Sequence, residues 1–223
     1  MAVSYVVADA TAGTAFGEFM RGFMIGVNAG MNAVFATVLF GPVIGIALGV
    51  INFLAAVDEV AANPVYQGIL GWSSWLMPMS WLATGVGLAV FLINVVVGFF
   101  AHTVPNWFGV GGWDQARINS VSVDWGTGTI VMHGGMFTIA RGGYNLGNFA
   151  YIHRDSAADA SLIGHETGHT LNVAAFGSIF HYIGAIDENL VGRFAGAYAE
   201  QLADSHDPTR VVADTTVWQE TWV

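Results

Sequence analysis

The chain has 223 residues, of which 54% are hydrophobic and only 10% are charged, whereas soluble domains carry about a quarter charged residues. The formal net charge is −10 and no basic cluster offsets it, which argues against nucleic acid as a partner because phosphates are held mainly by Lys and Arg. The absence of cysteine excludes disulfide bonds and thiolate ligands, so any metal site must use His and carboxylate groups.

The first twenty residues form a predicted N-terminal arm. They begin with an apolar run over residues 3–7 that is rich in β-branched side chains, and they then pass through Thr11, Gly13 and Thr14. This pattern indicates a short strand or an extended arm. We expect such a terminal segment to be held by a sheet or by a neighbouring subunit.

Two long uncharged stretches, residues 23–56 and 69–100, follow the arm. Each exceeds the roughly 20 residues that a helix needs to cross a bilayer, and a chain of this size lacks the surrounding protein to bury both. We therefore expect two transmembrane segments, the first too long for a cleaved signal peptide. Arg21 precedes the first stretch, the loop at residues 58–59 is acidic, and the other arginines follow the second stretch, which predicts cytoplasmic termini.

The first stretch carries small residues at helical spacing. Such a stripe lets helix backbones approach closely in lipid, so we expect it to meet either the second stretch or another copy of the chain. Pro42 is expected to kink or break this stretch, which is too long for one straight crossing. Asparagines inside the stretches are expected to join helices by hydrogen bonds. The stripe comprises Gly22, Gly26, Gly30, Ala33, Thr37, Gly41, Gly45 and Gly49, and the asparagines are Asn28, Asn32, Asn52 and Asn94.

From Asn119 the hydrophobic period changes from that of a helix to that of a strand. Apolar and polar residues alternate on both sides of Gly126-Thr127-Gly128, which predicts a β-hairpin. Further strand-like pieces at residues 136–140 and 148–152, separated by Gly142 and Gly143, complete a small antiparallel sheet.

A HExxH sequence, from His165 through Glu166 to His169, lies on a helix that we expect to begin near Ser156 or Asp159. The i, i+4 spacing places both imidazoles on one face of the helix, at a distance suited to one zinc ion. Glu166 then lies beside the open coordination position, where a general base takes a proton from water and passes it to a leaving amine. The motif needs a third ligand.

Glu200, within residues 199–204 (AEQLAD), is the best candidate for that ligand. One helical turn separates it from Asp204, so Glu200 can bind zinc while Asp204 holds the second nitrogen of a ligand imidazole. Asp187 and Glu188 compete for the role, but they follow an apolar run and lack an i+4 carboxylate partner. We expect one zinc per chain, although the same donors accept other divalent metals.

Residues 142–148 (GGYNLGN) and 162–172 (LIGHETGHTLN) resemble uncharacterised bacterial membrane-associated proteins that have a GFxLGN-type strand ahead of HExGHTxQ. Those proteins look like gluzincin zinc peptidases, and the similarity covers residues 119–206 without the apolar stretches. It implies a peptidase in a bacterial inner membrane. The chain departs from the pattern at Asn172, where the family has Gln, and at residues 177–180, which read Gly-Ser-Ile-Phe in place of Gly-Pro-Leu-Tyr.

A zinc peptidase also needs hydrogen-bond donors for the oxyanion of its tetrahedral intermediate. Tyr198, His181 and His206 are the candidates, and the sequence does not choose among them. The resemblance further implies that Asn148 supports the site from the neighbouring strand.

Together these patterns predict an α+β membrane protein. Two transmembrane helical segments are followed by a small antiparallel β-sheet and a zincin-like pair of metal-binding helices. The expected parts are the N-terminal arm (residues 1–20), the membrane region (residues 21–103) and the metal-binding domain (residues 104–223).

Two functions compete for this architecture. The first is a membrane zinc metallopeptidase that cleaves a peptide or protein substrate with its active domain against the cytoplasmic face. The second is a structural membrane protein that forms a ring-like homo-oligomer through the glycine stripe and the N-terminal arm, with the metal fold kept as a scaffold. An intramembrane protease is a weaker third hypothesis, because Asp155, Asp159 and Asp187 flank the HExxH helix.

Overall fold

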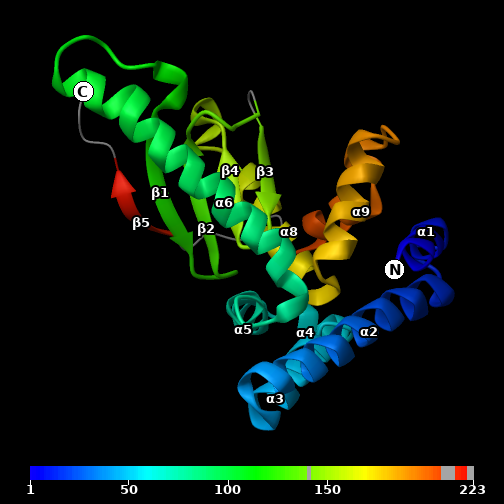
Figure 1. The fold of residues 1–223 in the computed structure, drawn as a ribbon. Helices are drawn as coiled ribbons and strands as arrows, with labels where there is room; N and C mark the ends of the chain where they lie inside the picture. Colours follow the sequence, from blue (N-terminus) through cyan, green and yellow to red (C-terminus); the bar gives the residue numbers. More distant parts are fainter. Residues whose placement is uncertain (140–141, 207–213, 220–223) are drawn as a thin grey trace.

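The computed structural model describes residues 1–139, 142–206 and 214–219. A small sheet lies between two helices, α6 (Trp81–Gly98) on one face and α8 (Ala160–Phe176) on the other, and the N-terminal helices pack against the far end of α8 (Figure 1). The structure is therefore mixed helix and sheet, as predicted. The other helices are α1 (Ala2–Ala10), α2 (Ala15–Phe40), α3 (Pro42–Leu54), α4 (Asp58–Ala61), α5 (Pro64–Ser74), α7 (Val104–Trp107), α9 (Ser178–Asn189) and α10 (Tyr198–Ser205), with short 3-10 or π turns at Pro78–Ser80, Phe99–Thr103, Asp114–Ala116, Arg154–Ser156 and Phe194–Gly196.

The sheet has five strands in the order β3-β4-β2-β1-β5. The predicted hairpin is formed by β1 and β2, and Gly128 in its turn has a φ of +66°, which favours glycine. β2 pairs with β4 in parallel, so the prediction of an antiparallel sheet is wrong at this pair. The strands are β1 (Ile118–Asp124), β2 (Thr129–Gly134), β3 (Gly143–Leu146), β4 (Phe149–Ile152) and β5 (Asp214–Gln219).

β2 and β4 run parallel because the chain goes from β2 to the edge of the sheet, forms β3 there, and then turns back to form β4. β3 forms the edge of the sheet, and a turn at Gly147 brings β4 back between β3 and β2. The strand expected at residues 148–152 corresponds to β4, whereas residues 136–139 form a loop and residue 140 lies outside the described residues. β3 begins instead at Gly143, within the glycine pair that the sequence pattern assigned to a connection.

Alternate residues of β4 bind the sheet to the helices on its two faces. Phe149 packs against Phe91 of α6, and the Tyr151 hydroxyl donates to a backbone carbonyl of the same helix. Ala150 and Ile152 point the other way and pack in a cluster with α8. The helix that carries HExxH is thus fixed to the sheet along one side.

The N-terminal segment is a helix, α1, and not the strand or extended arm expected from its composition. Its buried Tyr5 packs against Phe180 of α9 and Tyr198 of α10, and the Tyr5 hydroxyl donates a hydrogen bond of 3.0 Å to Asp187 Oδ2. These tertiary contacts override the weak strand preference of the β-branched residues. The neighbour that holds the segment lies in the same chain.

The first apolar stretch breaks at Pro42, as predicted, and folds back on itself. Gly41 has a φ of +92°, which favours glycine, and α3 then returns along α2. A Cβ on Gly45 would lie 2.6 Å from the Ala33 carbonyl oxygen, and one on Gly49 would lie 2.7 Å from the Ala33 Cβ. The second half of the glycine stripe therefore packs on the first half within one chain, which is neither of the partners expected from the sequence.

The remaining glycines of the stripe lie on α2. A Cβ on Gly22 would lie 4.0 Å from Ala56, and one on Gly26 would lie 3.7 Å from Phe53, so both positions face the returning segment. A Cβ on Gly30 would meet nothing within 4 Å in the described part of the chain. Little of the stripe is left for contact with a second copy.

Asparagines join this helical hairpin to α8. Asn28 and Asn32 both donate to Asn52 Oδ1 at 2.9 Å, and Asn52 donates to the Ala175 carbonyl oxygen at 2.9 Å. The last carbonyls of a helix have no helical N–H partner, and the cluster supplies one. The hairpin thereby holds the C-terminal end of α8, and three of the four asparagines join helices as predicted.

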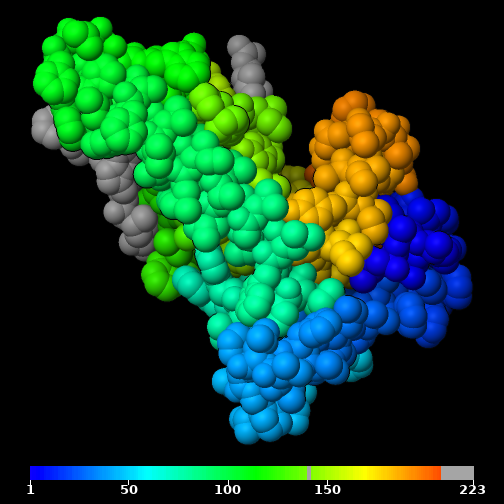
Figure 2. All heavy atoms as spheres, viewed as in Figure 1, coloured from blue at the N-terminus to red at the C-terminus, as the bar shows by residue number. Residues whose placement is uncertain are grey.

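Two helical runs are long and apolar enough to cross a membrane, Ala15–Phe40 and Pro78–Trp107. Only 33% and 28% of their most apolar windows are buried within the chain, so their outer faces need a covering of lipid or protein. The two runs do not pack along each other: α2 packs on α3, and α6 packs on the sheet. Figure 2 shows both runs at the surface, with α2 (blue) along the bottom of the view and α6 (teal to green) rising to the upper left. Exposed apolar side chains on them include Val34, Val38, Leu82, Leu92 and Phe100.

Candidate metal centre

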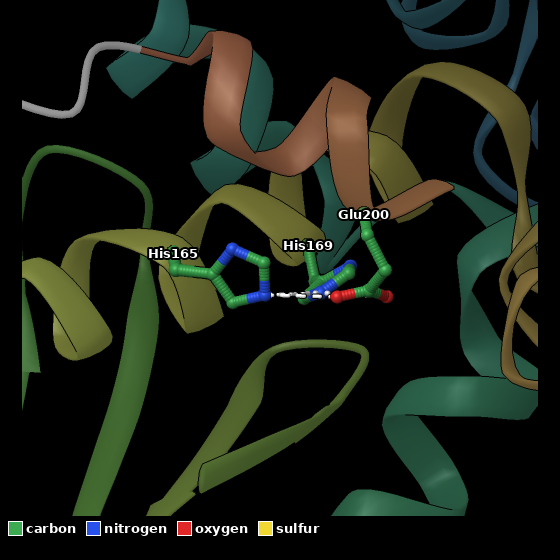
Figure 3. Close-up of side chains that lie close together, drawn as sticks. All are labelled: His165, His169 and Glu200. Atoms are coloured by element: carbon green, nitrogen blue, oxygen red, sulfur yellow. Dashed lines mark hydrogen bonds and ion pairs between the residues drawn. The ribbon is translucent and has the colours of Figure 1, made fainter. Parts of the chain in front are cut away.

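The HExxH sequence lies on α8, and Asp159 caps this helix. Asp159 Oδ1 accepts hydrogen bonds from the backbone N–H groups of Ser161 and Leu162, each at 3.1 Å. Residues four apart share one face of a helix, so His165 and His169 point to the same side (Figure 3). Their Nε2 atoms lie 3.2 Å apart.

Glu200 reaches both imidazoles from α10. Its Oε2 lies 3.0 Å from His165 Nε2, and its Oε1 lies 3.4 Å from His169 Nε2. Gly168 makes this approach possible, because a Cβ there would lie 2.6 Å from the Ala203 carbonyl oxygen of α10. The two helices touch through their backbones and bring the three predicted ligands together (Figure 3).

The spacing of these three side chains fits a metal ion. Their donor atoms all lie within 4.8 Å of one another. Ligands that are about 2.0–2.1 Å from a tetrahedral zinc ion lie about 3.3 Å apart. The two imidazole Nε2 atoms lie 3.2 Å apart, close to that spacing, and each has a carboxylate oxygen of Glu200 nearby, Oε2 at 3.0 Å from His165 and Oε1 at 3.4 Å from His169. Two imidazoles with a carboxylate are donors that zinc accepts.

Asp204 lies behind His165, with Asp204 Oδ1 2.7 Å from His165 Nδ1. A carboxylate in this position fixes the imidazole tautomer and leaves Nε2 as the ligand atom. Burial lowers the pKa of His165, but the hydrogen bond to Glu200 and the nearby carboxylates outweigh burial and raise this pKa to about 9. Burial opposes ionisation of Glu200, yet hydrogen bonds from both histidines hold its pKa well below the usual range. A proton on His165 therefore competes with a metal for one nitrogen.

Glu166 lines the same cavity of about 430 Å³ as the ligand group. It is 5% exposed, and burial raises its pKa to about 7 against the opposing effect of the two histidines. The edge strand β3 passes close to Glu166: a Cβ on Gly143 would lie 2.8 Å from Glu166 Oε1. Figure 2 shows the surface hollowed between β3 and α9, which form two sides of this cavity. A carboxyl group with a pKa near neutrality is suited to accept and return a proton.

Of the three candidate oxyanion donors, only His181 lines the metal cavity. Its Nε2 lies 3.0 Å from the Asn145 carbonyl oxygen, and burial, together with the nearby His169, lowers its pKa to about 4. Tyr198 and His206 instead line a second cavity, on the other face of α8. The structure does not bring them to the ligand group.

The competing carboxylates occupy other positions. Asp187 accepts a hydrogen bond from Tyr5, and Glu188 lines the metal cavity without belonging to the ligand group. Asn148 is buried and accepts a hydrogen bond from Thr84 of α6 at 2.9 Å. Asn148 therefore joins the turn between β3 and β4 to α6 and does not line the metal cavity.

Tyr182 also lines the metal cavity, although no sequence pattern pointed to it. Its hydroxyl is buried and has no hydrogen-bond partner within the part of the chain that the structure describes. A buried hydroxyl of this kind is available to a bound ligand. An aromatic residue in an apolar helix looks like core packing, so only the fold reveals its position.

No protein-family model, curated protein or solved structure matches this chain.

Proposed function

We propose that the chain is a membrane-integral zinc metallopeptidase that holds one zinc ion per chain and hydrolyses peptide bonds. The main support for the proposal is the convergence of His165, His169 and Glu200, whose ligand atoms all lie within 4.8 Å of one another, in a donor set that a zinc ion accepts. The two apolar helical runs support a location in a membrane. The resemblance to bacterial HExGHT proteins is consistent with both parts of the proposal.

Glu166 is the general base of the proposed reaction. Zinc, when bound, supplies Lewis acidity that acidifies water and polarises the substrate carbonyl. Glu166 accepts the proton of the attacking water and returns it to the leaving amine. With a pKa of about 7, Glu166 holds its proton neither too tightly nor too weakly for both transfers near neutral pH.

Tyr182 is the proposed hydrogen-bond donor to the developing oxyanion. Tyr182 lines the cavity, and its buried hydroxyl is not engaged by another described residue, so it can donate without first losing a bond. His181 is less suitable, because its Nε2 already faces the Asn145 carbonyl oxygen at 3.0 Å. This choice replaces the three candidates suggested by the sequence.

A peptide can enter along β3. This strand is at the edge of the sheet, and Tyr144, Asn145 and Leu146 line the metal cavity. An extended peptide that adds to a sheet edge is held by backbone hydrogen bonds, with side-chain pockets for specificity. We propose unstructured peptide segments as the substrate class.

Substitution of Glu166 by Gln tests the proposal in the full chain purified in detergent and loaded with zinc. Glu166→Gln should keep zinc and lose hydrolysis of a labelled unfolded protein by about 10²–10⁴-fold. Glu59→Gln, at an exposed position on α4, is the matched control and should behave as the parent. A zinc-loaded parent without hydrolytic activity, or an active Glu166→Gln variant, would contradict the proposal.

A further inference from the structure

A second cavity lies on the other face of α8 from the metal centre. It has a volume of about 360 Å³ and is lined by residues of α2, α4, α5, α8 and α10. This volume falls in the range of pockets that bind small molecules. Nothing in the proposed peptidase reaction uses the cavity, so its role needs a separate explanation.

The inner wall of the second cavity is apolar. The side chains that form it come from four helices, so the wall is part of the packed core and not of a loop. An aliphatic chain placed against such a wall is removed from water, which favours its binding. The wall includes Ile25, Leu70, Leu171, Phe176 and Leu202.

The side-chain oxygen of Gln67, a buried residue on this cavity, has no hydrogen-bond donor among the described residues. Gln67 is 3% exposed and lines the cavity. Its Nε2 donates to the Ala61 carbonyl oxygen at 3.0 Å, but its Oε1 accepts no hydrogen bond from the described residues. A buried acceptor without a donor is costly. A ligand that donates a hydrogen bond to Gln67 Oε1 removes that cost.

The charged groups of the cavity favour a cation over an anion. Arg21 lines the cavity, but its guanidinium is already paired with Glu18 at 2.9 Å and with Asp58. It also donates to the Ala55 carbonyl oxygen at 3.3 Å. Two carboxylates thus outnumber one cation, and both carboxylates are accessible, with side chains 52% and 71% exposed. An anionic head would meet net repulsion here.

We propose that the second cavity binds a single-chain cationic amphiphile, a primary alkylammonium. Its head donates a hydrogen bond to Gln67 Oε1 in a cavity that Glu18 and Asp58 also line, and its chain lies on the apolar wall. The cavity volume of about 360 Å³ corresponds to about twelve water molecules at about 30 Å³ each, and we choose a chain of about eight to ten carbons as a ligand of similar size. This proposal does not depend on the peptidase function.

The test compares octylammonium with octanoate, which has the same chain length and the opposite charge. Both are titrated into the full chain in detergent micelles, and binding is followed by calorimetry and by the rise in thermal midpoint. We expect octylammonium to bind at least about tenfold more tightly than octanoate. Equal affinity for the two compounds reflects partitioning into apolar surface alone and overturns the proposal.

Two variants locate the binding. Gln67→Leu removes the acceptor, and Leu70→Trp fills the cavity while it keeps Gln67. Each should weaken octylammonium binding at least about tenfold, whereas Gln201→Leu, at an exposed glutamine that lines neither cavity, should bind as the parent does. Unchanged binding in a folded Gln67→Leu or Leu70→Trp variant overturns the proposal. If both variants fail to fold, the preference of the parent for octylammonium over octanoate decides alone.

Discussion

The role of Asp204 can be tested by removing its charge without removing its hydrogen-bond acceptor. Asp204→Asn keeps an oxygen at the position that lies 2.7 Å from His165 Nδ1 but lowers the basicity of the ligand nitrogen. Loss of such a supporting carboxylate typically weakens metal binding by about 10–100-fold. The Asp204 side chain is 63% exposed, and solvent screens its charge, so we expect the lower end, about tenfold or about 1.4 kcal/mol.

The assay is competition for zinc between the detergent-purified protein and a chromophoric chelator. Asp155→Asn is a matched control, because Asp155 also lies beside a histidine, with Oδ2 3.6 Å from His153 Nδ1, and its side chain is 65% exposed. We expect this control to bind zinc as the parent does. Equal zinc affinity in Asp204→Asn and the parent would mean that Asp204 does not orient and polarise His165 for metal binding.

Three further predictions concern the approach of the helices, pH and the N-terminal helix. Gly168→Ala places a Cβ 2.6 Å from the Ala203 carbonyl oxygen, so it should lower stability by about 1–3 kcal/mol and weaken zinc binding, as measured by thermal unfolding and by chelator competition. Zinc affinity should rise about tenfold per pH unit below about pH 9 and level off above it. The reason is that the metal must displace the proton that His165 holds with a pKa of about 9. A zinc affinity that stays constant between pH 6 and pH 8 would contradict this prediction. Tyr5→Phe removes the donor to Asp187 and should cost about 1–3 kcal/mol in thermal unfolding, and an unchanged midpoint would mean that α1 does not hold α9.

Features that depend on local sequence were predictable. The i, i+4 spacing placed His165 and His169 on one face of a capped helix, and Pro42 marked a helix break, because each signal acts within one or two turns of chain. The pairing of the HExxH helix with Glu200 was also accessible, since a zinc site of this type requires a third ligand.

Features that depend on distant contacts were not predictable. The β-branched residues near Tyr5 favour a strand locally, but packing against α9 and α10 makes the segment helical. The parallel β2–β4 pair follows from the order of the strands in the sheet, with β4 between β2 and β3, which no alternation pattern encodes. The glycine stripe was expected to meet another helix, and the break at Gly41 allows it to meet itself.

The internal contacts of the stripe and of α1 also bear on the homo-oligomer hypothesis. Both features suggested contacts between subunits, and both are engaged within one chain. Assembly therefore stays a prediction that rests on the exposed apolar faces of α2 and α6, which lipid covers equally well.

Metal content per chain is the most direct test of the central claim. The full-length protein, purified in detergent without added chelator, is measured beside His169→Ala and Glu166→Gln by elemental analysis. We expect about one zinc per chain in the parent and in Glu166→Gln, and almost none in His169→Ala, because His169 is one of three proposed protein ligands. A parent protein that holds no zinc and cannot be loaded with it would mean that His165, His169 and Glu200 do not form a zinc site.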